Sequence, residues 1–260
     1  MQAGLALVRR PGPLLAQGLV THIDRTPVDV GLARHQWAAY TAALEAAGWD
    51  LLEVPPADDC PDAVFIEDTV VMFHSVAVIT RPGADTRKPE VHAVDELVRS
   101  LGFTINRIQA PGSLDGGDVL KVGDVVYVGR GGRTNAEGVR QLRAILSPLG
   151  ATVVAVPLHK VLHLKSAVTA LPDGSIIGHA PLVDDPAFFP RFVAVPEESG
   201  AHVVLLGGAK LLMAADCPRT AIQLEDLGYE PVLVDISEFQ KLEGCVTCLS
   251  VRVREVVPWG

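Results

Sequence analysis

The sequence is poor in three features that would assign a protein to a class at once: cysteine, long apolar runs and positive charge. Its 260 residues contain four cysteines, too few for a disulfide framework. No apolar run reaches the roughly eighteen residues that cross a bilayer, and Arg9 and Arg10 interrupt the stretch that a signal peptide would keep apolar. Lys and Arg number 22 against 31 acidic residues, a net charge of −9, which disfavours nucleic acid and anionic lipid as partners.

The overall amino-acid composition predicts a compact globular protein. Apolar residues make up 48% of the chain and charged residues 20%, which excludes intrinsically disordered, collagen-like and low-complexity proteins. The length allows a sizeable core. We therefore expect a single cytoplasmic domain spanning residues 1–260, a monomer or homodimer that binds a small molecule.

Apolar periodicity predicts a series of helices, each followed by a short apolar strand. The helices are expected at residues 31–49, 89–102, 134–150 and 218–228, with a weaker candidate at 186–192. The strands are expected at residues 51–54, 103–108, 151–156, 193–195 and 232–234. A capping box from Thr134 to Glu137 is predicted to open the third helix.

Pairs of β-rich runs precede most of these helices, so the repeating unit is strand, strand, helix, strand. The pairs are residues 64–73 with 76–80, 119–122 with 125–128, and 166–171 with 175–177. The unit recurs about every 45 to 50 residues, a period typical of radial or solenoid repetition. Its copies are anchored at Glu67, Asp115, His163, the pair Gly207 and Gly208, and Cys248.

The two ends of the chain supply the parts of a fifth unit. A strand at residues 5–9 and the first helix lack preceding strands, while the strands at 249–257 lack a following helix. Joining them would close a ring and remove the exposed sheet edges. The expected fold is an α/β five-bladed propeller closed by the N- and C-termini, with a plain α/β sandwich as the alternative. A ring would gather the equivalent positions of the repeats in one central cleft.

Two residue types in these central positions suggest nucleophilic catalysis. Cys248 and Cys245 form a C-x-x-C motif, which by itself suggests a redox pair, half a zinc site or two buried structural thiols. The motif precedes a strand, whereas a thioredoxin-type pair opens a helix, and no second pair completes a zinc site. His163 at an equivalent position becomes a candidate general acid and base.

Carboxylates interrupt apolar stretches near two of the anchors. Glu67 and Asp68 lie within the apolar run at 63–73, and Asp62 borders it. Such acids require a buried cation or strong donor as compensation. One repeating unit later, Asp115 likewise interrupts an apolar stretch, beside two glycines. Arg87 and Arg133 lie in polar loops before helices, where ordinary surface arginines are the simpler interpretation and no phosphate loop follows.

These segments together resemble the dimethylarginine dimethylaminohydrolase family, within the guanidine-modifying superfamily. The resemblance covers nearly the whole chain, in order and at compatible spacing. It is carried by FIED at 65–68, TRPGA at 80–84 with Arg87, LDGGDVL at 114–120, RTN at 133–135, LHLKS at 162–166 and TCLS at 247–250.

The resemblance implies a five-bladed α/β propeller and a role for each motif residue. Cys248 would be the nucleophile, His163 the proton donor and Asp115 its acidic partner. Glu67 and Asp68 would hold the substrate guanidinium. Asp62 would lie near the amino-acid end of the substrate, and Arg87 and Arg133 would bind its carboxylate. Main-chain oxygens of Leu19 and Leu242 would bind its ammonium group.

The implied reaction converts methylated arginine to citrulline through a covalent thiouronium on the cysteine, with no metal or organic cofactor. A guanidinium is planar, delocalised and permanently cationic, so carboxylates must fix it before a nucleophile attacks its carbon. Two alternatives stay open. One is an arginine deiminase, whose usual helical insertion is not visible here. The other is a non-enzymatic C-x-x-C metal or redox module.

Overall fold

A computed structural model gives the structure of the protein and describes residues 4–253. The α-helices are α1 (Val30–Ala46), α2 (Val91–Ser100), α3 (Ala136–Leu146), α4 (Pro218–Asp226) and α5 (Ser237–Gln240). The strands are β1 (Gly4–Val8), β2 (Trp49–Glu53), β3 (Val70–Phe73), β4 (Val76–Ile79), β5 (Thr104–Arg107), β6 (Val119–Val122), β7 (Val125–Arg130), β8 (Thr152–Pro157), β9 (Val168–Ala170), β10 (Ile176–Gly178), β11 (Phe192–Ala194), β12 (Val204–Gly207), β13 (Lys210–Ala214), β14 (Glu230–Val234) and β15 (Val251–Val253).

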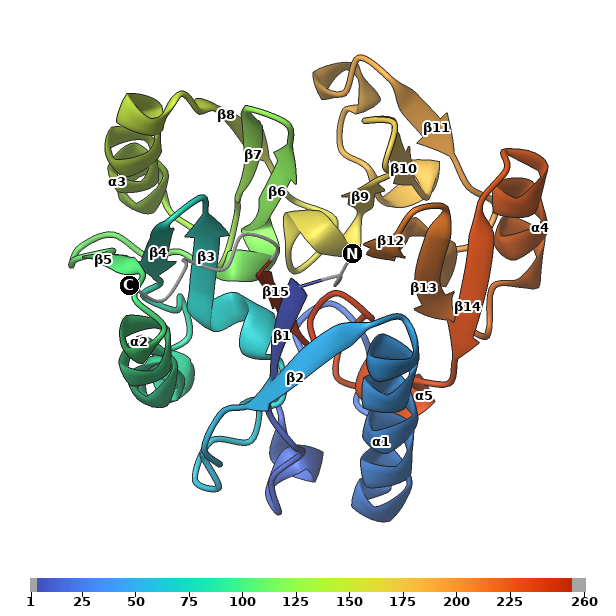
Figure 1. Cartoon of the computed structure of the whole chain (residues 1–260), viewed down its shortest axis with the longest axis horizontal. Helices are drawn as coiled ribbons and strands as arrows, with labels where there is room; N and C mark the ends of the chain where they lie inside the picture. Colours follow the sequence, from blue (N-terminus) through green and yellow to red (C-terminus); the bar gives the residue numbers. More distant parts are fainter. Residues whose placement is uncertain (1–3, 254–260) are drawn as a thin grey trace.

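Within the described residues, the strands form five three-stranded sheets of one design. In four sheets the central strand pairs antiparallel with the preceding strand and parallel with the following one, as β4 does with β3 and β5. In the remaining sheet the central strand β1 pairs antiparallel with β15, the last strand of the described chain, and parallel with β2. The parallel connection passes through α1, α2, α3 or α4 in four of the sheets. Figure 1 shows the sheets arranged around a common centre with these helices on the outside. The α/β character and the predicted repeating unit are confirmed.

The first sheet combines both ends of the described chain. Its strand order is β15, β1, β2, and β1 pairs antiparallel with β15 so that Leu5 faces Val253. The strand predicted at 249–257 is shorter in the structure, because residue 249 belongs to a turn and residue 250 to no regular element. Its last part, 254–257, lies outside the described residues.

The fourth sheet departs from the predicted unit because no α-helix connects its parallel strands. Between β10 and β11 the chain forms two 3₁₀ turns, Ala180–Leu182 and Pro186–Phe188. The weak helix expected at 186–192 is therefore wrong. Pro181, Pro186 and Pro190 each lack an amide N–H, and this segment cannot form a continuous ladder of helical hydrogen bonds.

The capping box predicted at the start of the third helix is also wrong. Asn135, not Thr134, is the N-cap of α3, and its side chain accepts a hydrogen bond from the Gly138 N–H at 2.8 Å. The Thr134 hydroxyl is directed instead to the carboxylate of Asp118. Thr134 is consequently part of the interior and not of the helix end.

Apolar strands supply the cores between the sheets and the helices. The largest cluster packs α1, α4 and α5 against the first and fifth sheets. Three further clusters lie between neighbouring sheets: first and second, second and third, and third and fourth. Among residues 4–253, no helix has the length and apolarity required to cross a membrane.

Candidate active site

A short turn precedes the first strand of each sheet and carries the polar residues of the centre. Four of these turns are 3₁₀ helices, at Ile66–Thr69, Gly116–Asp118, Leu164–Ser166 and Ser199–Ala201. The fifth, at 246–249, precedes β15 and includes Cys248. The Glu67 N–H donates to the Cys248 carbonyl oxygen at 3.2 Å, so segments far apart in sequence are directly joined.

One of the five sequence anchors was misplaced. Gly207 and Gly208 lie at the hairpin between β12 and β13, both with positive φ (121° and 57°). The position equivalent to the other anchors is the turn Ser199–Ala201. A glycine pair also marks tight hairpins, and the sequence pattern did not separate that use from a central turn.

A small pocket brings together eight of the ten residues predicted for the site. Asp115 and Glu67 are the two that do not line it. The lining residues are Leu19, Asp62, Phe65, Asp68, Arg87, Arg133, Leu162, His163, Leu242, Glu243, Gly244 and Cys248.

The His163 imidazole lies among buried carboxylates. Its Nε2 is hydrogen-bonded to Asp115 Oδ2 at 3.0 Å, and its Nδ1 is 3.9 Å from Asp68 Oδ1. Burial alone would lower the pKa of His163, but the charges of Asp68, Asp115 and Asp118 outweigh it and raise this pKa to about 9. At neutral pH the ring is therefore an imidazolium and can donate a proton.

Cys248 lies beside the second cysteine of the motif. The Sγ atoms of Cys245 and Cys248 are 3.2 Å apart, and the Cys245 thiol also contacts the Thr247 hydroxyl at 3.2 Å. The hydrogen bond with Cys245, burial and the carboxylates of Glu67 and Asp68 raise the pKa of the Cys248 thiol well above its ordinary value. The hydrogen bond from Cys248 lowers the pKa of Cys245. Without a ligand, Cys248 is thus held as the thiol.

Arg87 lines the pocket, but each of its three guanidinium nitrogens already has a hydrogen-bond partner in the protein. Its guanidinium pairs with Glu90 through Nε and Nη2, and with Asp68 Oδ2 through Nη1 at 2.6 Å. Nη2 also donates to the main-chain oxygens of Asp62 and Phe65. Arg87 is therefore the buried cation that the sequence required beside these acids.

Arg133 retains a donor for a ligand. Its Nη1 is buried without a hydrogen-bond partner and lies 3.9 Å from Asp115 Oδ2. Its Nη2 is 3.5 Å from the Thr21 hydroxyl of the loop that precedes α1. An unpaired, buried guanidinium nitrogen is costly, and a carboxylate in the pocket would satisfy it.

The loop at 11–27 closes over the pocket. The Leu19 N–H donates to Asp62 Oδ1 at 3.0 Å, and the His22 N–H donates to Glu243 Oε1 at 2.9 Å. The Thr21 N–H also donates to Glu243. Burial raises the pKa of Asp62, although Arg87 and the Leu19 N–H act against this shift. The loop thus brings Leu19 into the lining of the pocket.

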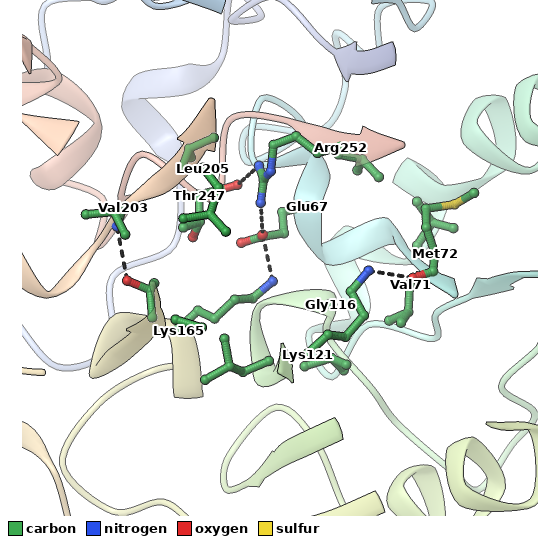
Figure 2. A pocket seen from close by; sticks show the side chains of 17 residues that line it. Glu67, Val71, Met72, Gly116, Lys121, Lys165, Val203, Leu205, Thr247 and Arg252 are labelled. Atoms are coloured by element: carbon green, nitrogen blue, oxygen red, sulfur yellow. Dashed lines mark hydrogen bonds and ion pairs between the residues drawn. The ribbon is translucent and has the colours of Figure 1, made fainter. Parts of the chain in front are cut away.

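Glu67 lines a different pocket from Asp68, whereas the resemblance implied that both acids hold the same guanidinium. Glu67 Oε1 pairs with Lys165 Nζ at 2.6 Å and with Arg252 Nη2 at 3.0 Å. Figure 2 shows Glu67 between these cations in a second pocket, which shares no lining residue with the first. Successive residues of a 3₁₀ turn point about 120° apart, so the adjacent carboxylates diverge.

Asp68, Asp115 and His163 also have the spacing of a metal site, with ligand atoms within 4.8 Å of one another. The carboxylates already accept other hydrogen bonds, however: Asp68 from Arg87 and the Gly117 N–H, and Asp115 from the Gly83 N–H. With a protonated ring between them, the cluster is best described as an imidazolium held by acids.

Sequence reasoning missed several groups that shape the site. A Cβ atom on Gly117 would lie 2.8 Å from His163 Nδ1 and 2.7 Å from Asp68 Oδ1, so only glycine lets the ring approach this turn. The Thr134 hydroxyl donates a hydrogen bond to the carboxylate of Asp118, the last residue of this turn. The Gly-Gly-Asp sequence was the available signal for Gly117 and Asp118, whereas nothing in the sequence distinguished Thr134 from a helix cap.

Comparisons with known proteins agree with these features. The chain is 68% identical over 256 residues to the N(G),N(G)-dimethylarginine dimethylaminohydrolase of Streptomyces coelicolor, covering 98% of this chain and 99% of that protein. It is 37% identical over 250 residues to the protein of the same name from Pseudomonas aeruginosa, covering 95% and 98%. No protein-family model matches the chain.

Solved structures show the same architecture. The P. aeruginosa enzyme, as a cysteine-to-serine mutant complexed with citrulline, superposes with a TM-score of 0.90 at 36% identity, covering 97% of this chain and 100% of that one. The N-terminal domain of the cyanobacterial arginine dihydrolase ArgZ shares the fold, with a TM-score of 0.84 at 19% identity over 97% and 98%. The chain belongs to the dimethylarginine dimethylaminohydrolase family.

Proposed function

We propose that this protein hydrolyses Nω-methylated arginine, both asymmetric dimethylarginine and monomethylarginine, to citrulline and the corresponding methylamine. The observation that carries the proposal is the pocket in which Cys248, His163, Asp68 and Arg133 meet from four separate segments. A thiol, an imidazolium, a carboxylate and a guanidinium with an unpaired donor are the groups that this reaction and substrate require.

The two ends of the substrate would be bound by groups of opposite charge. Arg133 would bind the substrate carboxylate through its unpaired Nη1. Asp62 and the main-chain oxygens of Leu19 and Leu242 would receive the ammonium group. Asp68 would hold the substrate guanidinium. Arg87 can join in carboxylate binding only by exchanging one of its present bonds.

In the first step, the Cys248 sulfur would attack the guanidinium carbon. Because carboxylates raise the pKa of this thiol, the positive charge of the bound substrate would favour the thiolate, and the thiol proton would pass to solvent water. A C–S bond forms, His163 gives its proton to the methylated nitrogen, and the C–N bond breaks with release of the amine. The remaining group is an S-alkylthiouronium on Cys248.

In the second step, water would replace the sulfur. The neutral His163 ring takes a proton from water, the resulting oxygen nucleophile adds to the thiouronium carbon, and the C–S bond breaks. Citrulline leaves and Cys248 returns as the thiolate. Asp115 would orient the ring throughout, since it is hydrogen-bonded to Nε2. The proposed steps use no metal or organic cofactor.

We further propose that residues 1–260 form one catalytic domain and that its five sheets close into a propeller. The pairing of β1 with β15 supports closure, because the first sheet takes strands from both ends of the described chain. A closed ring would explain how residues from 62 to 248 reach one pocket.

The proposal is tested by incubating the purified protein with arginine, N-methylarginine and asymmetric dimethylarginine and measuring citrulline. We expect product from the methylated substrates, and loss of turnover in Cys248→Ser and His163→Gly with unchanged circular dichroism. Product from arginine alone would favour a deiminase. Stoichiometric zinc with no turnover would favour the C-x-x-C metal module, and substantial activity in either variant would remove that residue from the mechanism.

A further inference from the structure

We propose that Asp118 is a positioning residue, which sets the geometry and the protonation of His163 for the reaction proposed above. The inference rests on that proposed function, but its main measurement does not require turnover. Asp118 is buried and lines neither of the two pockets described here. It therefore acts through other residues and has no direct contact with the substrate.

The two carboxylate oxygens of Asp118 hold two catalytic segments together. Oδ1 accepts a hydrogen bond from the Leu164 N–H at 3.0 Å, and Oδ2 accepts one from the Thr134 hydroxyl at 2.5 Å. Leu164 follows His163 in the chain and Thr134 follows Arg133. One side chain thus fixes the main chain next to the imidazole and next to the proposed carboxylate-binding arginine.

The same hydrogen-bond network includes Asp115. The Thr134 hydroxyl accepts from the Asp115 N–H at 3.1 Å while donating to Asp118, and the Asp118 N–H donates to the Asp115 carbonyl oxygen at 3.0 Å. Asp115 in turn is hydrogen-bonded to His163 Nε2. Both partners of the His163 and Asp115 pair are therefore anchored to Asp118.

A glycine makes room for this arrangement. A Cβ atom at Gly129 would lie 2.6 Å from Asp118 Oδ1 and 3.0 Å from the Leu164 Cβ. Any larger residue there would push the carboxylate away from the Leu164 N–H. The fold thus reserves space on β7 for the contact between Asp118 and the His163 segment.

The electrostatic effect of Asp118 on His163 supports a role for Asp118 beyond packing. Asp118 is one of three carboxylates that raise the pKa of His163, with Asp68 and Asp115. Burial raises the pKa of Asp118 itself to about 7, although the positive charge of His163 acts against this shift. The other ionisable groups on the pocket wall are Cys248, Arg133, Asp62, Arg87 and Glu243. Asp118 thus helps to keep the ring protonated before the amine leaves.

The decisive variant is Asp118→Asn, which keeps the shape of the side chain and removes its charge. We expect the pKa of His163 in the free protein, followed by NMR of ¹³C-labelled histidine and assigned with His163→Gly, to fall by about one unit. With methylarginine, kcat should fall at least about tenfold while KM stays within about threefold. An unchanged His163 titration with unchanged kcat would overturn the proposal.

Thr134 provides a second test that leaves the Asp118 side chain in place. Thr134→Val removes the bridging hydroxyl and should lower kcat about tenfold, whereas Thr134→Ser should restore it to within about threefold of the wild type. The matched control is Thr220→Val. Thr220 is equally buried and donates to Glu197 Oε2 at 2.9 Å, remote from the pocket, so its kcat should be unchanged.

The outcomes separate this proposal from the proposed function. If the wild type forms no citrulline, the proposed function fails, and the NMR titration still decides whether Asp118 controls His163. If Asp118→Asn does not fold, the Thr134 variants decide. Wild-type kcat in Thr134→Val, or an equal loss in Thr220→Val, would reduce the network to a general contribution to stability and overturn the inference.

Discussion

Proton positions in a few buried side chains determine what the pocket can do. His163 carries a proton at neutral pH because acids surround it, and Cys248 keeps its proton because acids and a second sulfur surround it. Both situations suit the proposed reaction of a cationic substrate: His163 would already hold the proton for the leaving amine, and Cys248 would ionise only when the positive charge of the substrate is beside it. A cysteine that was ionised at all times would instead be more susceptible to oxidation.

Cys245 should therefore tune the nucleophile. Replacing it with alanine removes the sulfur 3.2 Å from Cys248 and with it the leading cause of the raised pKa. In Cys245→Ala we expect the midpoint of Cys248 alkylation by iodoacetamide, measured against pH and located by peptide mass spectrometry, to move about one unit or more to lower pH.

Cys217 provides the control for that measurement. It is buried like Cys245, but its thiol donates to the Ala214 carbonyl oxygen and it is absent from the pocket lining. Cys217→Ala should leave the alkylation midpoint of Cys248 in place. An unchanged midpoint in Cys245→Ala would mean that burial and the nearby carboxylates alone hold the proton on Cys248.

At the scale of elements, the short turns before the inner strands are the parts that carry chemistry. Arg87 fixes one of them by joining the turn Ile66–Thr69 to the segment before α2, through Asp68 on one side and Glu90 on the other. Both carboxylates are buried. Removal of the shared cation would take the ion-pair partner from Glu90 and leave Asp68 with only the more distant His163 ring as a cationic partner among the described residues.

Arg87→Ala should consequently destabilise the fold, not merely weaken substrate binding. We expect the free energy of unfolding, measured by urea denaturation, to fall by about 3–5 kcal/mol. Arg140→Ala is the control, because Arg140 forms an exposed pair with Glu137 on α3 and should leave the unfolding midpoint unchanged. Wild-type stability with a raised KM in Arg87→Ala would instead restore the sequence-based view that Arg87 binds the substrate carboxylate.

At the scale of the whole molecule, the proposed ring closure makes a prediction about chain connectivity. Leu5 pairs with Val253, so the ends of the described chain are adjacent and a short Gly/Ser linker can join them. New termini between Gly208 and Ala209 would open the hairpin between β12 and β13, whose glycines are exposed. We expect this circular permutant to unfold in one cooperative transition and to keep kcat within about tenfold of the wild type.

The opposite behaviour of the permutant would argue against a closed ring. Loss of the cooperative transition in the permutant, with the same linker harmless in an unpermuted chain, would show that the chain order of the sheets matters beyond their contacts. The five sheets would then be better described as an open array than as a closed ring.

Much of the architecture was predictable because each repeat contains its own local signals. The apolar stripe of α2 and the alternating strands around Val125 reflect neighbours within a few residues, and the period between repeats follows from them. The errors arose where one local pattern serves two purposes. Thr134 has the sequence of a helix cap, and Gly207 with Gly208 has that of a central turn, yet tertiary contacts assign both differently.

The repeating unit, the residue types of the site and the family could be inferred from the sequence alone, because local periodicity and motif spacing are properties of the chain. The direction of each polar side chain could not, because it follows from contacts made in the folded molecule. The fold directs Glu67 to Lys165 and Arg252, and directs Asp68 to Arg87 and the His163 pocket. Such choices depend on charges brought from distant segments, since a buried acid is stable only where the fold supplies it with a partner.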